Sequence, residues 1–341
     1  MAAKGPARSV QDIWPRRGPL AFALWPLSLL YGALLALRRQ GYARGLLRTH
    51  RVPALVVVVG NVVAGGAGKT PVVLELARHL QKRGLTVGIV SRGYARRGQA
   101  CLEVQTGMQA SQCGDEPLLL KRALGVPVFV ARKRVEAAQA MLQRYPATRV
   151  ILCDDGLQHL ALARDIEVCL FDERALGNGW LLPAGPLRER WPRAADFILC
   201  PEPTGRPGHY QVRRTLSDLA LKSDGQTLPL EQLHGQRILA LAAIAHPEAF
   251  FEMLRGKGLI LEQAFALPDH DGIQAWTPPE GMNLPLVITE KDAVKLWPRR
   301  PEALAARLNI SLDDAFWSAF DNLIEAKLSS PPLAATQDRH G

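Results

Sequence analysis

Short apolar runs alternate with longer amphipathic segments between residues 55 and 155 of this 341-residue chain. Residues 55–59 are one leucine and four valines, too few for a helix, and they end at a glycine, which predicts a buried strand. Further strands are predicted over residues 85–90, 126–130 and 150–153, and helices over 69–80 and 135–144. Strands that alternate with helices predict an α/β fold, in which helices flank a parallel sheet and right-handed crossovers join the strands.

The first predicted strand leads through a glycine-rich loop into a helix. The loop reads Gly65-Gly66-Ala67-Gly68-Lys69-Thr70-Pro71. Backbone N–H groups of such a loop bind phosphate, because glycine tolerates the required dihedral angles and the helix dipole favours negative charge. Lys69 would reach the β- and γ-phosphates of a nucleotide, and Thr70 would place its hydroxyl on Mg²⁺. Val63 stands where the strict P-loop pattern has glycine, so this is a variant. The alternative is a glycine-rich turn with a surface lysine.

The N-terminal segment is both apolar and basic. Residues 18–37 contain no charge, although Pro26 interrupts the run, and a pair of arginines stands on each side. Residues 1–51 carry nine Lys and Arg against one Asp, a net charge of +8 out of the +10 of the whole chain. Trp25, Tyr31 and the flanking arginines favour a helix at the surface of an anionic membrane. A buried core helix and a true membrane span remain the alternatives.

The rest of the chain suggests a second unit. Three prolines and two glycines in residues 200–208 predict a hinge. Beyond the hinge, strands are predicted over residues 237–243 and 284–289, and a helix over 247–257. We therefore expect an N-terminal helix (1–50), a P-loop nucleotide-binding domain (51–205), a smaller C-terminal α/β domain (206–328) and a disordered tail (329–341). The five cysteines form no C-x-x-C pair, which argues against a disulfide framework or a zinc site and for a cytosolic location.

Several polar residues come directly after predicted strands. They are Lys69, Arg92, Tyr94, Asp154 and Asp155. Because sites in parallel sheets lie at the carboxyl ends of the strands, we expect these side chains to converge. Two aspartates after an apolar strand are typical of a Mg²⁺ site that shares the cation with nucleotide phosphates. The alternative for each aspartate is a helix N-cap.

Six motifs follow one another along the chain: Gly60-Asn61 with residues 65–71, Ser91-Arg92-Gly93-Tyr94, Gly114-Asp115-Glu116-Pro117, and residues 154–159, 182–189 and 289–296. Taken together, this set of motifs resembles the tetraacyldisaccharide 4'-kinase family of lipid A biosynthesis. It implies ATP- and Mg²⁺-dependent phosphorylation of the 4'-hydroxyl of a lipid A disaccharide 1-phosphate. It also implies a peripheral, monotopic location at the cytoplasmic face of a Gram-negative inner membrane.

The resemblance also implies roles for individual residues. Asp115 would be the catalytic base, with His270 of the second domain as its partner, although Asp271 stands where the family has a second histidine. Without the resemblance, Asp115 reads equally as a helix cap. Asp154, Asp155 and Thr70 would hold Mg²⁺ together with Glu189. Substrate phosphates and hydroxyls would contact Arg92, Tyr94, Arg134 and Arg188; a surface ion pair or a solvated face is the alternative for each arginine. His246 lies in a loose version of its motif and receives no role.

Two other classes of protein compete with the kinase. A membrane-associated ATPase or GTPase of the switch or partitioning type would have a signature lysine at position 64, where this chain has alanine. A nucleic-acid-binding arm on a nucleotide-binding core would be polar, whereas residues 18–37 are apolar. We therefore expect a lipid A precursor and an anionic membrane as partners, and no nucleic acid; no protein partner is evident.

Overall fold

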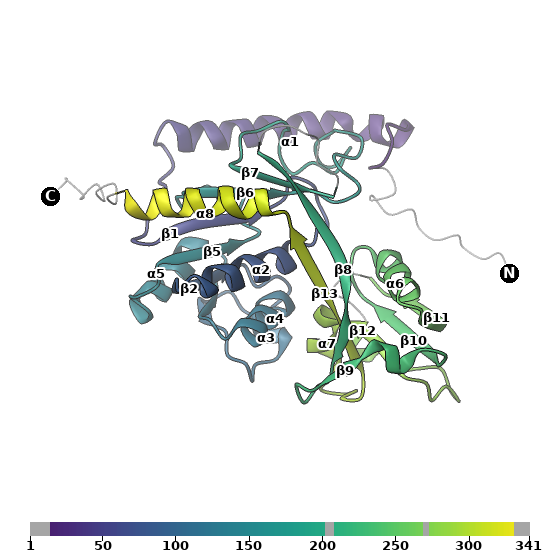
Figure 1. The fold of residues 1–341 in the computed structure, drawn as a ribbon. Helices are drawn as coiled ribbons and strands as arrows, with labels where there is room; N and C mark the ends of the chain where they lie inside the picture. Colours follow the sequence, from purple (N-terminus) through teal and green to yellow (C-terminus); the bar gives the residue numbers. More distant parts are fainter. Residues whose placement is uncertain (1–13, 202–207, 269–272, 331–341) are drawn as a thin grey trace.

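The structure is a computed structural model that describes residues 14–201, 208–268 and 273–330 (Figure 1). Its first unit is built on β1 (Leu55–Gly60), which pairs in parallel with β5 and β6. The neighbouring strands are β2 (Val87–Ser91), β4 (Val128–Val130), β5 (Val150–Asp154), β6 (Ile166–Leu170) and β7 (Phe197–Cys200), with the short β3 (Leu102–Glu103) antiparallel at the edge. The predicted parallel sheet is confirmed.

Helices cover both faces of this sheet, as its alternating side chains require. The helices are α2 (Lys69–Lys82), α3 (Ala110–Cys113), α4 (Asp115–Leu124) and α5 (Arg134–Arg144). Val57 and Val59 pack in one core cluster with α2 and α4, whereas Val56 and Val58 pack in another with α5. β4 and β12 start two residues later than predicted, because Pro127 and Pro285 precede them and lack the N–H that a ladder needs.

The second unit continues the same sheet. It contains β8 (His209–Leu221), β9 (Thr227–Pro229), β10 (Arg237–Ala242), β11 (Ile260–Ala266), β12 (Leu286–Thr289), β13 (Leu304–Leu312), the helices α6 (Pro247–Gly256) and α7 (Glu290–Leu296), and two 3-10 turns, η2 (Leu230–Leu233) and η3 (Ile273–Ala275). The first residues of β8 pair with β7, and the rest pair antiparallel with β13. A single 13-stranded sheet therefore runs through the described residues.

The last helix returns to the first unit. α8 (Asp314–Ser329) lies alongside the strands of that unit (Figure 1), and its Phe316, Phe320 and Ile324 are buried in the same core cluster as Val57. The division at residue 205 stays a proposal, and the helix that follows the second unit in sequence packs on the first. Residues 202–207 of the expected hinge and 331–341 of the expected tail lie outside the described residues.

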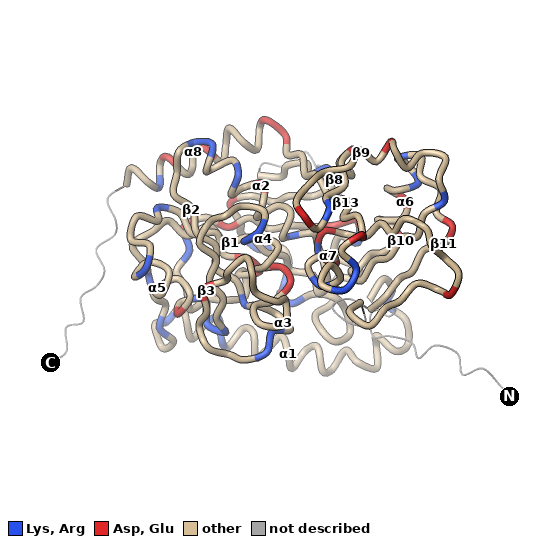
Figure 2. The backbone as a smooth tube through the Cα atoms, turned by 90° about the horizontal axis from the view of Figure 1, so that it is seen from below, with Lys and Arg blue, Asp and Glu red and all other residues tan. Residues whose placement is uncertain are grey.

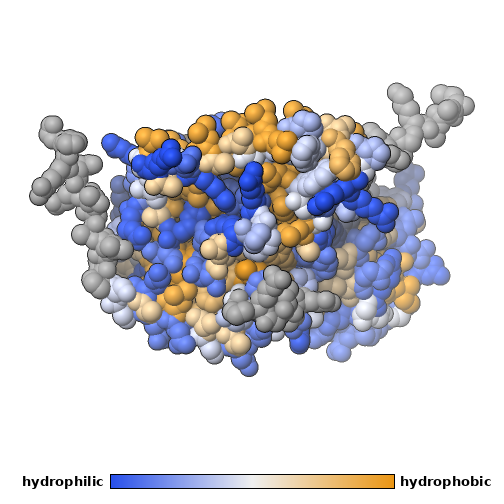
Figure 3. All heavy atoms as spheres, turned by 90° about the horizontal axis from the view of Figure 1, so that it is seen from above, coloured by the Kyte–Doolittle hydropathy of each residue, from blue (hydrophilic) through white to orange (hydrophobic). Residues whose placement is uncertain are grey.

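The N-terminal helix α1 (Pro19–Ala43) lies along one side of the molecule and continues through Pro26 without a break (Figure 1). By length and composition it could cross a membrane. Only Ala21, Ser28 and Gly32 of this helix are buried. Large apolar side chains of this helix are exposed: Leu20, Phe22, Trp25, Leu27, Leu29, Leu30, Leu34 and Leu37. Figure 3 shows hydrophobic residues gathered on the face where α1 lies. The helix is therefore not a core helix, and it is consistent with membrane association.

Candidate active site

The phosphate loop has the backbone that its glycines predict. Gly65 and Gly68 have φ angles of 98° and 68°, in the region that side chains disfavour, and Gly68 directly precedes α2. Two arginines donate hydrogen bonds to backbone carbonyls of the loop. Arg174 donates to the oxygen of Ala64 over 3.2 Å, and Arg214 donates to the oxygen of Ala67 over 3.0 Å. The loop is therefore preorganised as a cradle for an anion at the start of a helix.

Lys69, the first residue of α2, is aimed at the end of the central strands. Its Nζ donates to Asn61 Oδ1 over 3.3 Å and lies 3.5 Å from Asp155 Oδ1. Arg188 Nη1 approaches the same carboxylate, at 2.8 Å from Oδ1 and 3.1 Å from Oδ2. Burial raises the pKa of Asp155, but Lys69, Arg188 and Arg134 outweigh it, so the pKa lies below its usual value. Two cations that would contact phosphate thus share one carboxylate.

Asp154, the neighbouring aspartate, has a different environment. It is 1% exposed, and neither carboxylate oxygen has a hydrogen-bond partner within the described part of the chain. Burial and then the charge of Glu116 raise its pKa to about 7, against the opposing effect of Lys69. A buried carboxylate without partners fits a cation. The described residues contain no cluster of three or more His, Cys, Asp or Glu suited to a metal, so such a cation would need oxygen ligands from a bound phosphate as well.

Glu189 lies in a basic surrounding. It forms ion pairs with Arg39 of α1 and with Arg193, the latter over 3.6 Å, and it accepts a hydrogen bond of 2.7 Å from Gln158. It is 2% exposed. Its predicted role as a Mg²⁺ ligand stays a prediction. The helix contact was not predicted: Arg39 joins α1 to the residue next to Arg188.

The remaining predicted substrate contacts lie in different places. Arg134 is buried, and its Nη2 donates to the backbone oxygens of Asp154 and Asp155 over 3.3 and 3.0 Å. It therefore supports the turn that carries both aspartates. Tyr94 is 58% exposed and Arg92 is also exposed, on the loop after β2. Binding of substrate by these three residues stays a prediction.

Asp115 begins α4, after Gly114 with a φ of 97°. Its Oδ2 lies 2.8 Å from Nζ of Lys295 on α7, and this pair is buried. The sequence assigns no function to residues 289–296, which include Lys295, because the spacing of the motif does not show which acidic residue lies opposite this lysine. His270, the predicted partner of Asp115, lies outside the described residues.

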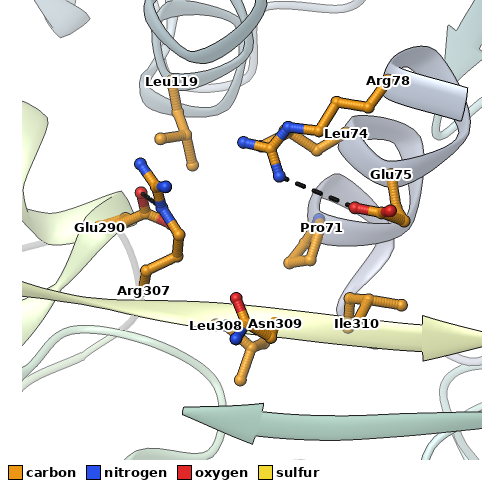
Figure 4. A pocket seen from close by; sticks show the side chains of 10 residues that line it. All are labelled: Pro71, Leu74, Glu75, Arg78, Leu119, Glu290, Arg307, Leu308, Asn309 and Ile310. Carbon is orange, nitrogen blue, oxygen red and sulfur yellow. Dashed lines mark hydrogen bonds and ion pairs between the residues drawn. The ribbon is translucent and has the colours of Figure 1, made fainter. Parts of the chain in front are cut away.

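A hollow of about 340 Å³ lies beside this region, between the two units (Figure 4). α2 and α4 form one wall, and α7 and β13 form the other. Its charged residues pair with one another: Arg307 Nε lies 3.0 Å from Glu290, and Arg78 lies 3.7 Å from Glu75. The unpartnered carboxylate of Asp154 instead lies at the end of β5, so we assign the chemistry to the phosphate loop.

Comparisons with known proteins show which family this chain resembles over its length. A family model described as Tetraacyldisaccharide-1-P 4'-kinase matches residues 20–327. A tetraacyldisaccharide 4'-kinase of Acidovorax sp. (strain JS42) is 54% identical over 326 residues, covering 95% of this chain and 96% of that protein. The one from Delftia acidovorans is 50% identical over 334 residues, covering 96% and 98%. The crystal structure of LpxK from Aquifex aeolicus in complex with ATP matches with a TM-score of 0.77 and 29% identity, over 91% of this chain and 99% of that one.

Proposed function

Because this chain belongs to the tetraacyldisaccharide-1-P 4'-kinase family, we propose that it transfers the γ-phosphate of ATP to the 4'-hydroxyl of a tetraacyldisaccharide 1-phosphate, a precursor of lipid A. The observation that carries the proposal is the geometry of the strand–loop–helix unit. Lys69 starts the helix after the glycine loop, and its Nζ faces Asp155 beside the unpartnered Asp154. A phosphate cradle, a cation and a free carboxylate are what phosphoryl transfer requires.

Binding of ATP would change the partners of the basic residues. Without phosphate, Lys69 and Arg188 pair with Asp155. The γ-phosphate carries more negative charge than one carboxylate, so it would compete for both cations and leave Asp155 with fewer partners. Thr70 and Asp154 would then hold Mg²⁺, with Asp155 and Glu189 as the further candidates. The ion would neutralise charge on the transferring phosphoryl group.

Asp115 would accept the proton of the acceptor hydroxyl. A positioned carboxylate in this role contributes roughly 10²- to 10⁴-fold in rate. The carboxylate stands at the N-terminus of α4, at the boundary of the two units, where it is 3% exposed. His270 is the proposed assistant in this step.

The acceptor is a lipid, and the outward surface of α1 suits its location. We propose that α1 lies on the cytoplasmic face of the inner membrane, with its exposed leucines in the acyl region and the exposed Arg16, Arg17 and Arg38 at anionic headgroups. Tyr31 of this helix donates to the backbone oxygen of Arg188 over 2.9 Å. The membrane helix and the phosphate-binding arginine are thus in direct contact, so a lipid substrate would enter beside α1.

The test is an assay with radiolabelled ATP, Mg²⁺ and detergent-dispersed tetraacyldisaccharide 1-phosphate. We expect label to appear on the lipid, with little release of free phosphate. The matched control omits the lipid, and there ATP consumption should be slow. Equal ATP hydrolysis with and without lipid, and no labelled lipid, would contradict the proposal and favour the ATPase of the switch or partitioning type.

A further inference from the structure

Residues 289–296 have no role in the chemistry described so far, yet this segment lies against the proposed base. α7 places Lys295 Nζ 2.8 Å from Asp115 Oδ2, and the two side chains are 8% and 3% exposed. One helical turn earlier, Lys291 Nζ lies 3.5 Å from Glu116 Oε1. Two lysines at i and i+4 therefore face two successive acids at the start of α4. Figure 2 shows α7 lying beside α4, with charged residues on both.

α7 itself is firmly held, so its lysines have a fixed origin. Thr289 caps the helix by accepting from the backbone N–H of Asp292 over 3.2 Å. Asp292 is fully buried, and its Oδ2 accepts from the hydroxyl of Thr289 and from the backbone N–H of Ala243, over 2.8 and 2.9 Å. The cap ties α7 to the end of β10, in the core of the second unit. A lysine anchored in this way carries its charge to a defined point.

The two pairs differ in the work they can do. The Lys291–Glu116 side chains are 19% and 28% exposed, so solvent screens their attraction. Asp115 and Lys295 are almost without solvent, and a buried carboxylate without a nearby cation is strongly destabilised. Among the described residues, Asp115 is the one ion-pair partner of Lys295, while Asp292 also lies within electrostatic range of this lysine. The Lys295 ammonium thus stabilises the charged form of Asp115 by attraction at close range, although within the described residues its Nζ makes no aligned hydrogen bond.

We propose that Lys295 is a positioning residue for phosphoryl transfer, which holds the Asp115 carboxylate ionised and oriented toward the acceptor from across the boundary of the two units. The inference rests on the proposed role of Asp115 as the base. A merely structural pair would join the units equally well but would not affect the chemical step selectively. The two readings differ in kinetics.

The test compares Lys295→Met and Lys295→Arg in the full-length enzyme. We expect Lys295→Met to lower kcat by roughly tenfold or more, a part of the roughly 10²- to 10⁴-fold contribution of a general base, with KM for ATP changed less than about twofold. Lys295→Arg retains the charge and should recover part of the rate. The control is Lys257→Met, which removes a lysine from an exposed ion pair with Asp218 in the same unit and should leave kcat unchanged.

A double-mutant cycle separates this inference from the role of Asp115. If Lys295 acts through Asp115, Lys295→Met should lower kcat further by less than about twofold in an Asp115→Asn enzyme. Equal losses in the two backgrounds, or an unchanged kcat of Lys295→Met, would overturn the inference while the base keeps its role. A fully active Asp115→Asn enzyme would overturn both. Should Lys295→Met fail to fold, Lys295→Gln, which also removes the charge, carries the same cycle with the same criteria.

Discussion

At the scale of single residues, the site is a set of charges that are paired with one another before any substrate is bound. Lys69 and Arg188 share Asp155, while Arg39 and Arg193 share Glu189. The sequence could predict most of these residues because each follows a strand or lies in a motif. It could not predict the pairs of Arg39 with Glu189 and of Lys295 with Asp115, since each of them joins two segments that are distant in the sequence.

Lys69→Ala should remove nearly all phosphoryl transfer, a loss of roughly 10²-fold or more, because the amino group neutralises charge on the β- and γ-phosphates. Its side chain is part of the site and not of a core cluster, so the thermal midpoint should change little. Initial rates with labelled ATP and thermal unfolding of the same preparation check both statements. Turnover close to that of the wild type in a folded Lys69→Ala enzyme would show that the loop is not the phosphate site.

His159 links stability to pH. Burial, and then the charges of Arg134, Arg38, Arg164 and Arg92, lowers its pKa from 6.5 to about 4. Its Nε2 accepts a hydrogen bond of 3.0 Å from the backbone N–H of Arg134, which only the neutral ring can do. The unfolded chain therefore binds this proton more readily than the folded one, so this contribution to stability is complete above about pH 6.5 and is lost as pH falls toward 4.

We expect a His159→Asn variant to show a smaller fall in Tm between pH 6.5 and pH 4 than the wild type, because the substituted residue does not titrate. Thermal unfolding in a series of buffers at constant ionic strength measures the difference between the two curves. The carboxylates titrate in the same way in both proteins, so their contribution cancels in that difference. Parallel curves would mean that folding leaves the pKa of His159 unchanged, which would contradict the lowered value.

At the scale of elements, α1 combines two surfaces that a hydrophobic pattern alone does not separate. Its small residues dock on the segment that carries Arg188: the Ser28 hydroxyl donates to the oxygen of Leu181 and accepts from the N–H of Ala184, over 2.8 and 2.9 Å. The side chain of Phe22 packs edge-on against Trp180. The sequence predicted an amphiphilic membrane helix from its leucines and arginines, but not that Ser28 and Gly32 would form the docking face, because small residues give no hydropathy signal.

The two surfaces of α1 should respond differently to substitution. Replacing the exposed Leu27, Leu30 and Leu34 by Gln should weaken binding to anionic vesicles by roughly 10²-fold or more with little change in Tm, because these side chains contribute to burial only when a membrane is present. Ser28→Ala should instead lower Tm and leave vesicle binding nearly unchanged. The substitution leaves the buried N–H of Ala184 without an acceptor, which costs roughly 1–3 kcal/mol of stability.

Co-sedimentation with vesicles and thermal unfolding without lipid measure the two effects separately. The leucine variant and Ser28→Ala serve as controls for each other, since they lie on the same helix. A leucine variant that binds vesicles as tightly as the wild type would move the membrane contact away from α1.

At the scale of the whole molecule, the two units share one sheet, and the last helix of the chain, which follows the second unit in sequence, packs on the first unit. β8 begins beside β7 and ends beside β13, and α8 then fills the core of the first unit. The predicted strands around the phosphate loop were found because each is a short apolar run followed by a turn. β8 and β13 were not predicted, since their burial alternates irregularly and their pairing is decided by partners about 90 residues away.

α8 should therefore be essential to the nucleotide-binding unit, although 242 residues (72–313) separate it from the phosphate loop in the sequence. Phe320 is fully buried between Phe197 and Phe316, with ring centroids 5.8 and 5.5 Å away. Phe320→Ala should destabilise the protein by roughly 3–5 kcal/mol, because the cavity left between the two remaining rings cannot close. The control is Lys327→Ala, an exposed position on the same helix, which should stay within about 0.5 kcal/mol of the wild type. Chemical denaturation, with ATP binding as the probe of folding, measures the stability of both variants.

A chain that ends at residue 312 lacks α8, and we expect that it does not retain a folded ATP site. If this truncated chain binds ATP and unfolds at the same denaturant concentration as the full chain, α8 contributes nothing to the stability of the nucleotide-binding unit.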